Sequence, residues 1–329
     1  MLPAFLTKKS IKSNAQIIAE NKEQAQNEVT NEMEQNNLEA VVENEYDYKQ
    51  FAKIRLLHKK NNEIEEVDLD EYLCNVVSAE MPADYEKEAL KAQAIVARTY
   101  TIYKAKNPKH ENSDICDDST CCQAWISKED RFSRWQEDKR ENNWEKIRQA
   151  VKETQGKIIT YNNEPINAFF HSNSGGTTEV PVNVWGGSNY PYLQVVQTSG
   201  EEGYNQYSSE AELTNEELIN KLKDKYSDIQ IDFNNDQDIK VLEYTDSNRV
   251  KTIKFGNHEI AGVEARSILG LKSTNFEIIK EPGKIKFSVK GYGHGVGMSQ
   301  TGADAMAKEG KTCEEIIQHF YVGVRIENI

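Results

Sequence analysis

The hydrophobic positions between residues 68 and 80 are spaced as on one face of an α-helix. They recur three and four residues apart, at Leu69, Tyr72, Leu73, Val76 and Val77. Asp68 and Glu71 form an acidic start signal, and Pro82 disfavours helical backbone at the residue before it. The pattern therefore predicts a helix that begins near Asp68 and ends near Glu80.

Glu80 falls in the last turn of this predicted helix, which is an unfavourable place for a negative charge. The C-terminal end of a helix dipole is negative, and Ala79, Met81 and Pro82 provide apolar surroundings. Both effects favour the protonated carboxyl group, the form that a general acid needs near neutral pH. The plainer alternative is a solvated glutamate at a helix end, since most glutamates are exposed.

A second predicted helix, residues 88–104, is apolar around most of its circumference and is expected to be buried. Gln93 and Arg98 would then lie in a dense interior, where a charge is costly unless it is paired. They are either structural tethers or the polar support of a site beside Glu80.

The remaining pattern predicts an α+β fold, because helices group early while strands recur without regular βαβ alternation. A hairpin is expected from strands at 51–58 and 63–67. A helix is expected at 135–152, and Thr214 with Glu217 forms a capping box that opens a short helix. Further strands are expected at 157–161, 166–170, 240–244, 250–255 and 287–290.

The composition indicates a soluble body of one large or two modest domains. The chain has 329 residues, a mean hydropathy of −0.75 and 29% charged residues. Residues 13–45 are rich in Asn, Gln and Glu, and residues 1–45 are therefore expected to form a tail or stalk. Residues 46–198 and 261–329 are expected to form one domain, with the acidic stretch 199–260 as an inserted subdomain.

The net charge of −14, from 40 basic against 54 acidic residues, argues against nucleic acid as a partner. Two glycine-containing loops, residues 170–176 and 291–300, carry many polar side chains. The second loop lacks the βαβ context and the acidic ribose contact of a dinucleotide site. The first loop, HSNSGG, lacks the G-x-S-x-G elbow of a serine hydrolase.

The order of the motifs is more specific than any one of them. Along the chain they read SAEMP, LKAQAIVARTY, FHSNSGG, VWGG, PYL, LGLKSTNF, GYGHGVGMSQTGADAMA and FYVGV. Together they resemble the stage II sporulation protein D family and the related amidase enhancer proteins, over about residues 68–323. The chain departs from the pattern at Tyr292 and Thr301, where many relatives have Trp.

The resemblance implies a lytic transglycosylase that cuts peptidoglycan between MurNAc and GlcNAc during engulfment in endospore formation. Glu80 of the SAEMP motif would be its catalyst. Hydrolytic glycosidases need two carboxylates, but here the muramyl 6-hydroxyl is the nucleophile and one glutamate suffices. The product is a 1,6-anhydro-MurNAc end. Asp84 and Glu86 lie close in sequence and are the carboxylates that this mechanism leaves unused.

The same resemblance implies where the protein works and with which partners. An N-terminal membrane anchor would precede this chain, since the opening MLPAFL is too short to span a membrane. The catalytic part would lie outside the cytoplasm, facing the septal and engulfing wall. The expected partners are glycan strands denuded of stem peptides and the stage II sporulation proteins P, an amidase, and M, a membrane scaffold.

The polar residues of the two loops are predicted to bind the glycan, with Gln93 and Arg98 as their support. The predicted wall of the groove consists of His171, Ser172, Ser174, Tyr292 and His294. Two non-catalytic alternatives remain open: an activator of a separate wall amidase, or a scaffold of the engulfment complex.

The loop at 105–125 holds three of the five cysteines and predicts a zinc site. His110, Cys116 and Cys122 are spaced six residues apart, and a Cys2His set suits tetrahedral zinc. The fourth ligand would be water, Cys121 or another side chain. A disulfide from Cys116 to Cys121 or Cys122 is the alternative, as exported proteins favour disulfides, but it gives His110 no role.

Overall fold

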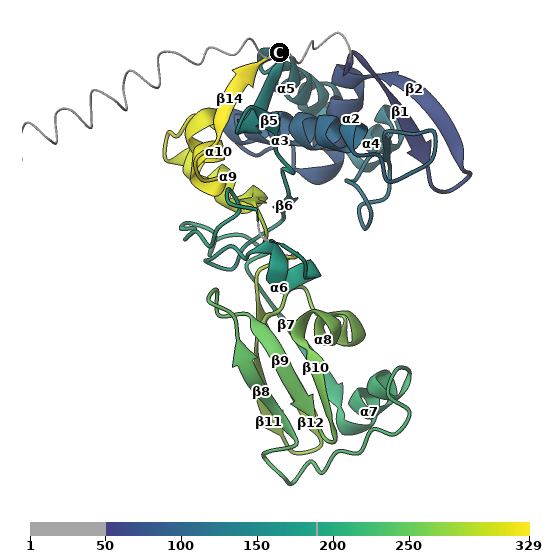
Figure 1. Ribbon diagram of the computed structural model, residues 1–329, viewed down its shortest axis with the longest axis vertical. Coiled ribbons are helices and arrows are strands. Elements are labelled where there is room, and N and C mark those ends of the chain that lie inside the picture. Colours follow the sequence, from purple (N-terminus) through teal and green to yellow (C-terminus); the bar gives the residue numbers. More distant parts are fainter. Residues whose placement is uncertain (1–50, 189) are drawn as a thin grey trace, which may run out of the picture. The chain divides into compact units, whose positions relative to one another are not determined.

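The computed structural model describes residues 51–188 and 190–329. The expected tail, residues 1–45, lies outside these residues, as does the opening MLPAFL. The described part is α+β, as the sequence predicts, with a group of helices and several small sheets (Figure 1). No helix among the described residues has the length and apolarity needed to cross a membrane.

Helix α3, Lys87–Lys106, forms the centre of the larger hydrophobic cluster. It packs against α2 (Leu69–Glu80), α5 (Arg140–Glu153), α9 (Gln300–Lys308) and α10 (Cys313–Phe320) (Figure 1). Neighbours on several sides explain why the sequence of α3 is apolar around most of its circumference. Its burial confirms the prediction for this segment.

Helix α2 begins and ends as its local sequence dictates. The Asp68 side chain accepts hydrogen bonds from the backbone N–H groups of Asp70 and Glu71, which caps the first turn. Met81 is extended, with φ −122° and ψ 144°, because Pro82 follows it. The helix therefore ends at Glu80, as predicted.

The predicted hairpin before α2 is confirmed as β1 (Lys53–His58) and β2 (Glu63–Asp68), which are antiparallel. Asn62 takes a positive φ of 59° in the turn, a conformation that asparagine tolerates. Strand β3, Ile115–Cys116, adds to β1 in parallel and fixes the cysteine-rich loop against the hairpin.

The two glycine-containing loops lie side by side because short strands join them. Strand β6, Phe170–His171, pairs in parallel with β13, Met298–Ser299. Asn173 and Tyr292 exchange backbone hydrogen bonds of 3.0 and 2.8 Å just beyond this pair. Segments more than 100 residues apart in sequence thereby share one wall.

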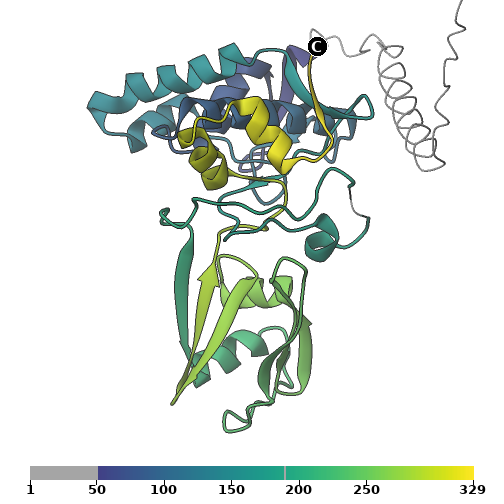
Figure 2. The same cartoon turned by 90° about the vertical axis from the view of Figure 1, so that its left-hand side faces the viewer.

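A second hydrophobic cluster holds two three-stranded sheets and two helices (Figures 1 and 2). The sheets follow the orders β11-β12-β7 and β10-β9-β8. Their elements are β7 (Ser208–Thr214), α7 (Asn215–Lys223), β8 (Ile239–Tyr244), β9 (Val250–Phe255), β10 (His258–Ala261), α8 (Gly262–Leu269), β11 (Asn275–Glu281) and β12 (Lys284–Lys290). The hydrophobic packing thus continues beyond residue 260, the predicted end of the insertion.

Two local predictions were wrong. The expected strand at 166–170 forms ladder pairs only around its ends, at β5 (Glu164–Pro165) and at β6. Residues 166–168 between them are buried without strand pairing. A continuous apolar run signals burial but does not specify a strand. The helix expected at 135–152 begins at Arg140 instead, after helix α4 (Lys128–Arg134) and a 3₁₀ turn, Glu137–Lys139.

The remaining elements complete the larger cluster. Strand β4, Lys157–Tyr161, is as predicted and pairs with β5 and with β14, Arg325–Asn328. Helix α6, Pro181–Trp185, follows the first glycine-containing loop and carries Trp185.

The predicted capping box of Thr214 and Glu217 is confirmed at the start of α7 in the second cluster.

Candidate active site

The carboxyl group of Glu80 is held by two hydrogen-bond donors from distant parts of the chain. The backbone N–H of Ala124 donates to Oε1 at 2.7 Å, and Nε2 of Gln300 donates to Oε2 at 3.3 Å. Gln300 is the first residue of α9, and its amide also contacts Oε1 of Gln93 at 3.5 Å. Gln93 thus contacts the side chain that reaches Glu80.

Burial raises the pKa of the Glu80 carboxyl group above its ordinary value. The hydrogen bonds from Ala124 and Gln300 act in the opposite direction, because they stabilise the carboxylate, but burial outweighs them. Glu80 keeps part of its surface accessible. The group is therefore a carboxylic acid that holds its proton to a higher pH and still has two donors ready for its anionic form.

Glu80 borders a cavity of about 1010 Å³, which we call the main cavity. Its lining includes the cations Lys104, Lys109 and Arg266. Glu80 is the only carboxylate among the described residues that line it. The described part of the cavity wall therefore offers one acid and no second carboxylate.

Four of the predicted wall residues line the main cavity: His171, Ser172, Tyr292 and His294. Ser174 does not line it and is fully buried. Arg98 also lies elsewhere: its guanidinium donates to the carbonyl oxygens of Thr154 and Val151, at 2.7 and 3.2 Å, and to Asp70. Arg98 is a tether between helices, one of its two sequence interpretations.

The two histidines are uncharged at neutral pH. Burial, followed by the nearby Arg249 charge, lowers the pKa of His171, and burial together with His171 lowers the pKa of His294. The Val296 carbonyl is 3.1 Å from His171 Nδ1, so that nitrogen donates and Nε2 carries the lone pair. His294 Nδ1 accepts the Val296 N–H at 3.0 Å, which places the proton of His294 on Nε2.

Two exposed aromatic side chains line the main cavity. Trp185 and Tyr292 are 52% and 41% exposed, which is unusual for such large rings. Thr301, by contrast, is fully buried and is not part of the lining. Its hydroxyl binds Asn173 and Glu201, so this departure from the family pattern falls at an interior position and does not remove a ring from the cavity wall.

Glu201 is a buried carboxylate that fastens both glycine-containing loops. Its donors are the hydroxyl groups of Ser174, Thr198, Ser299 and Thr301 and the backbone N–H groups of Ser174 and Gly176. Burial alone raises the pKa of Glu201, but these hydrogen bonds outweigh it and hold the pKa below its usual value. Ser299 and Thr301 flank Gln300, so Glu201 fixes the backbone that presents Gln300 to Glu80.

The cysteine-rich loop gathers four potential metal ligands. His110, Cys116 and Cys122 come together as predicted, and Cys121 joins them, with all four ligand atoms within 4.8 Å of one another. Nε2 of His110 is 3.3 Å from Cys121 Sγ and 3.7 Å from Cys122 Sγ. Sγ of Cys122 is 3.2 Å from Cys116 Sγ and 4.0 Å from Cys121 Sγ. All five cysteines are free thiols.

The metal-ligand cluster is joined directly to the Glu80 site through the chain. Cys121 and Cys122 themselves line the main cavity, and Ala124, two residues on, donates to Glu80. Between them, Gln123 is buried and donates to the Tyr72 hydroxyl at 2.8 Å. Whatever orders residues 121–124 therefore also positions one of the two donors of Glu80.

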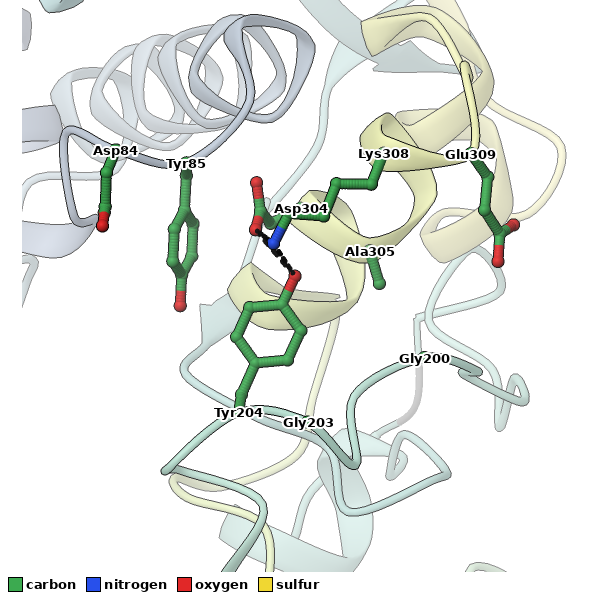
Figure 3. A pocket seen from close by; sticks show the side chains of 9 residues that line it. All are labelled: Asp84, Tyr85, Gly200, Gly203, Tyr204, Asp304, Ala305, Lys308 and Glu309. Carbon is green, nitrogen blue, oxygen red and sulfur yellow. Dashed lines mark hydrogen bonds and ion pairs between the residues drawn. The ribbon is translucent and has the colours of Figure 1, made fainter.

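Two smaller cavities lie nearby. One of about 530 Å³, which we call the side cavity, is lined by residues 79–84 and by Arg131, Trp135, Lys139, Asn143 and Gln206. The other, of about 590 Å³, contains none of the predicted site residues (Figure 3). There the Tyr204 hydroxyl and Lys308 converge on the buried Asp304, at 2.7 and 2.8 Å. Asp304 also accepts the Glu86 N–H, which ties α9 to the start of α3.

Comparisons with known proteins show the family to which the chain belongs. The family described as "Stage II sporulation protein" matches residues 57–161. Stage II sporulation protein D of Bacillus subtilis (strain 168) is 37% identical over 269 residues, which cover 81% of this chain and 76% of that protein. The chain belongs to the stage II sporulation protein D family.

Two further relatives of this stage II sporulation protein D family member differ in how much of their own length the chain covers. Stage II sporulation protein D of Bacillus amyloliquefaciens is 36% identical over 271 residues, covering 81% of the chain and 76% of that protein. The amidase enhancer of Bacillus subtilis (strain 168) is 28% identical over 303 residues, covering 77% of the chain and 40% of that protein. Membership of this family places the chain in sporulation.

Several site residues were missed by sequence reasoning. Gln300 belongs to the GYGHGVGMSQTGADAMA motif, but it lies 220 residues from Glu80 in the sequence, so no local pattern indicates their contact. Trp185 lay in the quoted VWGG motif without an assigned role. Arg266 and Glu201 gave no local signal, because their positions depend on how distant segments meet.

Proposed function

We propose that this protein is a peptidoglycan lytic transglycosylase that cleaves glycan strands between MurNAc and GlcNAc. The observation that carries the proposal is a single buried carboxyl group, with raised pKa and two donors, on a cavity whose described lining residues include no second carboxylate. Membership of the sporulation protein D family supports a substrate in the cell wall. The family also supports action outside the cytoplasm beside other sporulation proteins.

The proposed reaction uses Glu80 first as an acid and then as a base. The protonated carboxyl group gives its proton to the glycosidic oxygen, the bond from C1 of MurNAc to that oxygen breaks, and GlcNAc leaves with a 4-hydroxyl. The donors Ala124 and Gln300 stabilise the carboxylate that this step creates. The carboxylate then takes the proton of the muramyl 6-hydroxyl while the oxygen of that hydroxyl forms a bond to C1 of MurNAc. The proton balance closes on Glu80, and no water is consumed.

The cavity walls suit a sugar chain. Exposed rings such as Trp185 and Tyr292 offer flat apolar faces to pyranose rings, while Ser172 and the neutral histidines offer hydrogen bonds. His171 Nε2 has no hydrogen-bond partner among the described residues, although it is buried. It is an acceptor beside the cavity that a hydroxyl or amide of the glycan can satisfy.

Asp84 is the one carboxylate that needs a separate test. It is exposed and lines the side cavity together with Glu80, whereas Glu86 is exposed and lines none of the three cavities described above. A hydrolytic mechanism would need Asp84 to activate water. We expect Asp84→Asn to keep the product unchanged and at least about a tenth of the activity, since general base loss costs about 100-fold or more.

Labelled water distinguishes transglycosylation from hydrolysis. We expect purified protein acting on denuded glycan in water enriched in heavy oxygen to give MurNAc ends that carry no label, because the attacking oxygen comes from the sugar. Label at the new MurNAc ends of products formed by wild-type protein would show hydrolysis. The same label appearing in wild type but not in Asp84→Asn would assign the base.

The pH dependence of cleavage tests the contact between Gln300 and Glu80. The active acid is protonated, so activity falls as pH rises through the Glu80 pKa, which burial raises. Gln300 lowers that pKa by donating to the carboxylate. Gln300→Met removes the donor at similar size, so we expect the alkaline limb of the rate profile to move to higher pH. Gln318→Met, at an exposed position on α10, is the control. An alkaline limb that stays at the same pH, or moves to lower pH, in Gln300→Met would contradict the assignment.

We propose in addition that the cluster of His110 and the three cysteines binds zinc. In a tetrahedral site with zinc–sulfur bonds of about 2.3 Å, ligand atoms lie about 3.8 Å apart. Four separations within the cluster, from 3.2 to 4.0 Å, lie around this value before any adjustment to a metal. Three thiolates and an imidazole also form a donor set typical of structural zinc. The metal would order residues 121–124 and would take no part in the reaction.

A further inference from the structure

Glu80 is the only described residue that lines both the main cavity and the side cavity. Its two hydrogen-bond donors belong to the main cavity. A linear polymer bound with one bond beside the Glu80 carboxyl group must continue in two directions from that bond. The two cavities that meet at Glu80 provide two directions.

The side cavity has the chemistry of a saccharide site. Arg131, Lys139, Asn143 and Gln206 offer hydrogen-bond donors, and the amides also accept. Trp135 contributes an aromatic ring to the same wall. Hydroxyl and acetamido groups need both donors and acceptors, and a volume of about 530 Å³ lies within the usual range of small-molecule sites.

The walls of the side cavity are held by contacts of their own. The Arg131 guanidinium lies over the Trp135 ring, 4.9 Å from its centroid, and Nε of Arg140 donates to the Trp135 carbonyl at 3.3 Å. On the other wall, Lys146 donates to the carbonyl oxygen of Tyr85, which fixes the turn after α2 to α5. The cavity is therefore preformed and is no loose gap between elements.

We propose that the side cavity is the second arm of the glycan groove, which binds the saccharide units on the far side of the bond that Glu80 breaks. The inference rests on the proposed glycan substrate and adds a consequence to it. With an arm on each side of the acid, the strand lies across Glu80, and cleavage occurs inside long strands instead of only at their ends.

Two amide side chains of the side cavity allow a matched test. Asn143 and Gln206 line it, whereas their neighbours Asn142 and Asn205 are exposed and line none of the three cavities. Binding is measured in protein that carries Glu80→Gln and therefore does not cut the strand. Adding Asn143→Ala and Gln206→Ala to this protein should weaken its binding of long denuded strands by about 10-fold, because two hydrogen bonds are lost. Asn142→Ala combined with Asn205→Ala should bind as strongly as Glu80→Gln alone.

Cleavage gives the second measurement. On long strands the variant with Asn143→Ala and Gln206→Ala should lose about 10-fold in kcat/KM, while the variant with Asn142→Ala and Asn205→Ala should cleave them at the wild-type rate. Early wild-type products should include fragments of intermediate length. Equal binding by the two double variants, or release of only the smallest products from strand ends, would overturn the second arm. If wild type cuts no glycan at all, the proposed function fails, and the binding comparison still decides whether the side cavity holds a saccharide.

Discussion

Glu80→Gln should abolish glycan cleavage, with a loss of about 10,000-fold or more. Loss of a general acid alone costs about 100 to 10,000-fold, and here both proton transfers depend on the same carboxyl group. The amide keeps the size of the side chain and an oxygen for the Ala124 N–H. The variant should therefore fold, with a melting temperature equal to or above that of the wild type, because the buried group can no longer become charged.

Glu86→Gln is the matched control for this experiment. Glu86 is exposed and caps α3 without a side-chain hydrogen bond, although it lies only six residues after Glu80. It should cleave like wild type. Wild-type rates in Glu80→Gln would remove Glu80 from the chemistry, and equal losses in both variants would indicate a general effect of charge.

Loss of the proposed zinc site should have the second largest effect. We expect purified protein to contain about one zinc per chain, and His110→Ala or Cys116→Ser to contain nearly none. Without the metal, residues 121–124 lose their order and Glu80 loses the Ala124 donor, so activity should fall by about 100-fold or more, as when one donor to a reacting anion is removed. Metal content and melting temperature are measured beside activity.

His258→Ala provides the control, because His258 lies on β10 beside the second hydrophobic cluster, outside the metal-ligand cluster. It should keep both zinc and cleavage. Wild-type protein prepared without chelator that holds no metal and has fewer than three titratable thiols would decide for a disulfide. Full activity in metal-free His110→Ala would separate the cluster from the Glu80 site.

Local signals accounted for much of the fold near Glu80. The acidic cap at Asp68 and the stop at Pro82 act within a few residues, so both ends of α2 could be read from the sequence. The capping box at Thr214 likewise fixed the start of α7. Helix α4 was missed because it buries no residue and therefore shows no apolar face, although Ser127 caps it through the N–H of Asp130.

Long-range packing explains what the sequence could not provide. Ser174 was predicted in the groove from its loop, but Glu201, which occupies an acidic stretch without a motif, draws it into the interior. Gln300 lies beside Glu80 because β6 pairs with β13 and Glu201 binds the residues on either side of Gln300. The sequence left the fourth ligand open between water, Cys121 and another side chain, and the fold brings Cys121 to His110 beside Cys122. Such contacts depend on tertiary structure, which no spacing rule contains.

The most direct test of the proposed function is the mass of the products that purified protein releases from denuded glycan. A lytic transglycosylase should give fragments that end in 1,6-anhydro-MurNAc, each lighter by one water than the hydrolytic fragment of the same length. These products should be absent with Glu80→Gln. The proposed function would be contradicted by fragments with ordinary reducing MurNAc ends. It would also be contradicted if the pure protein cut no glycan and had an effect only when a wall amidase was added.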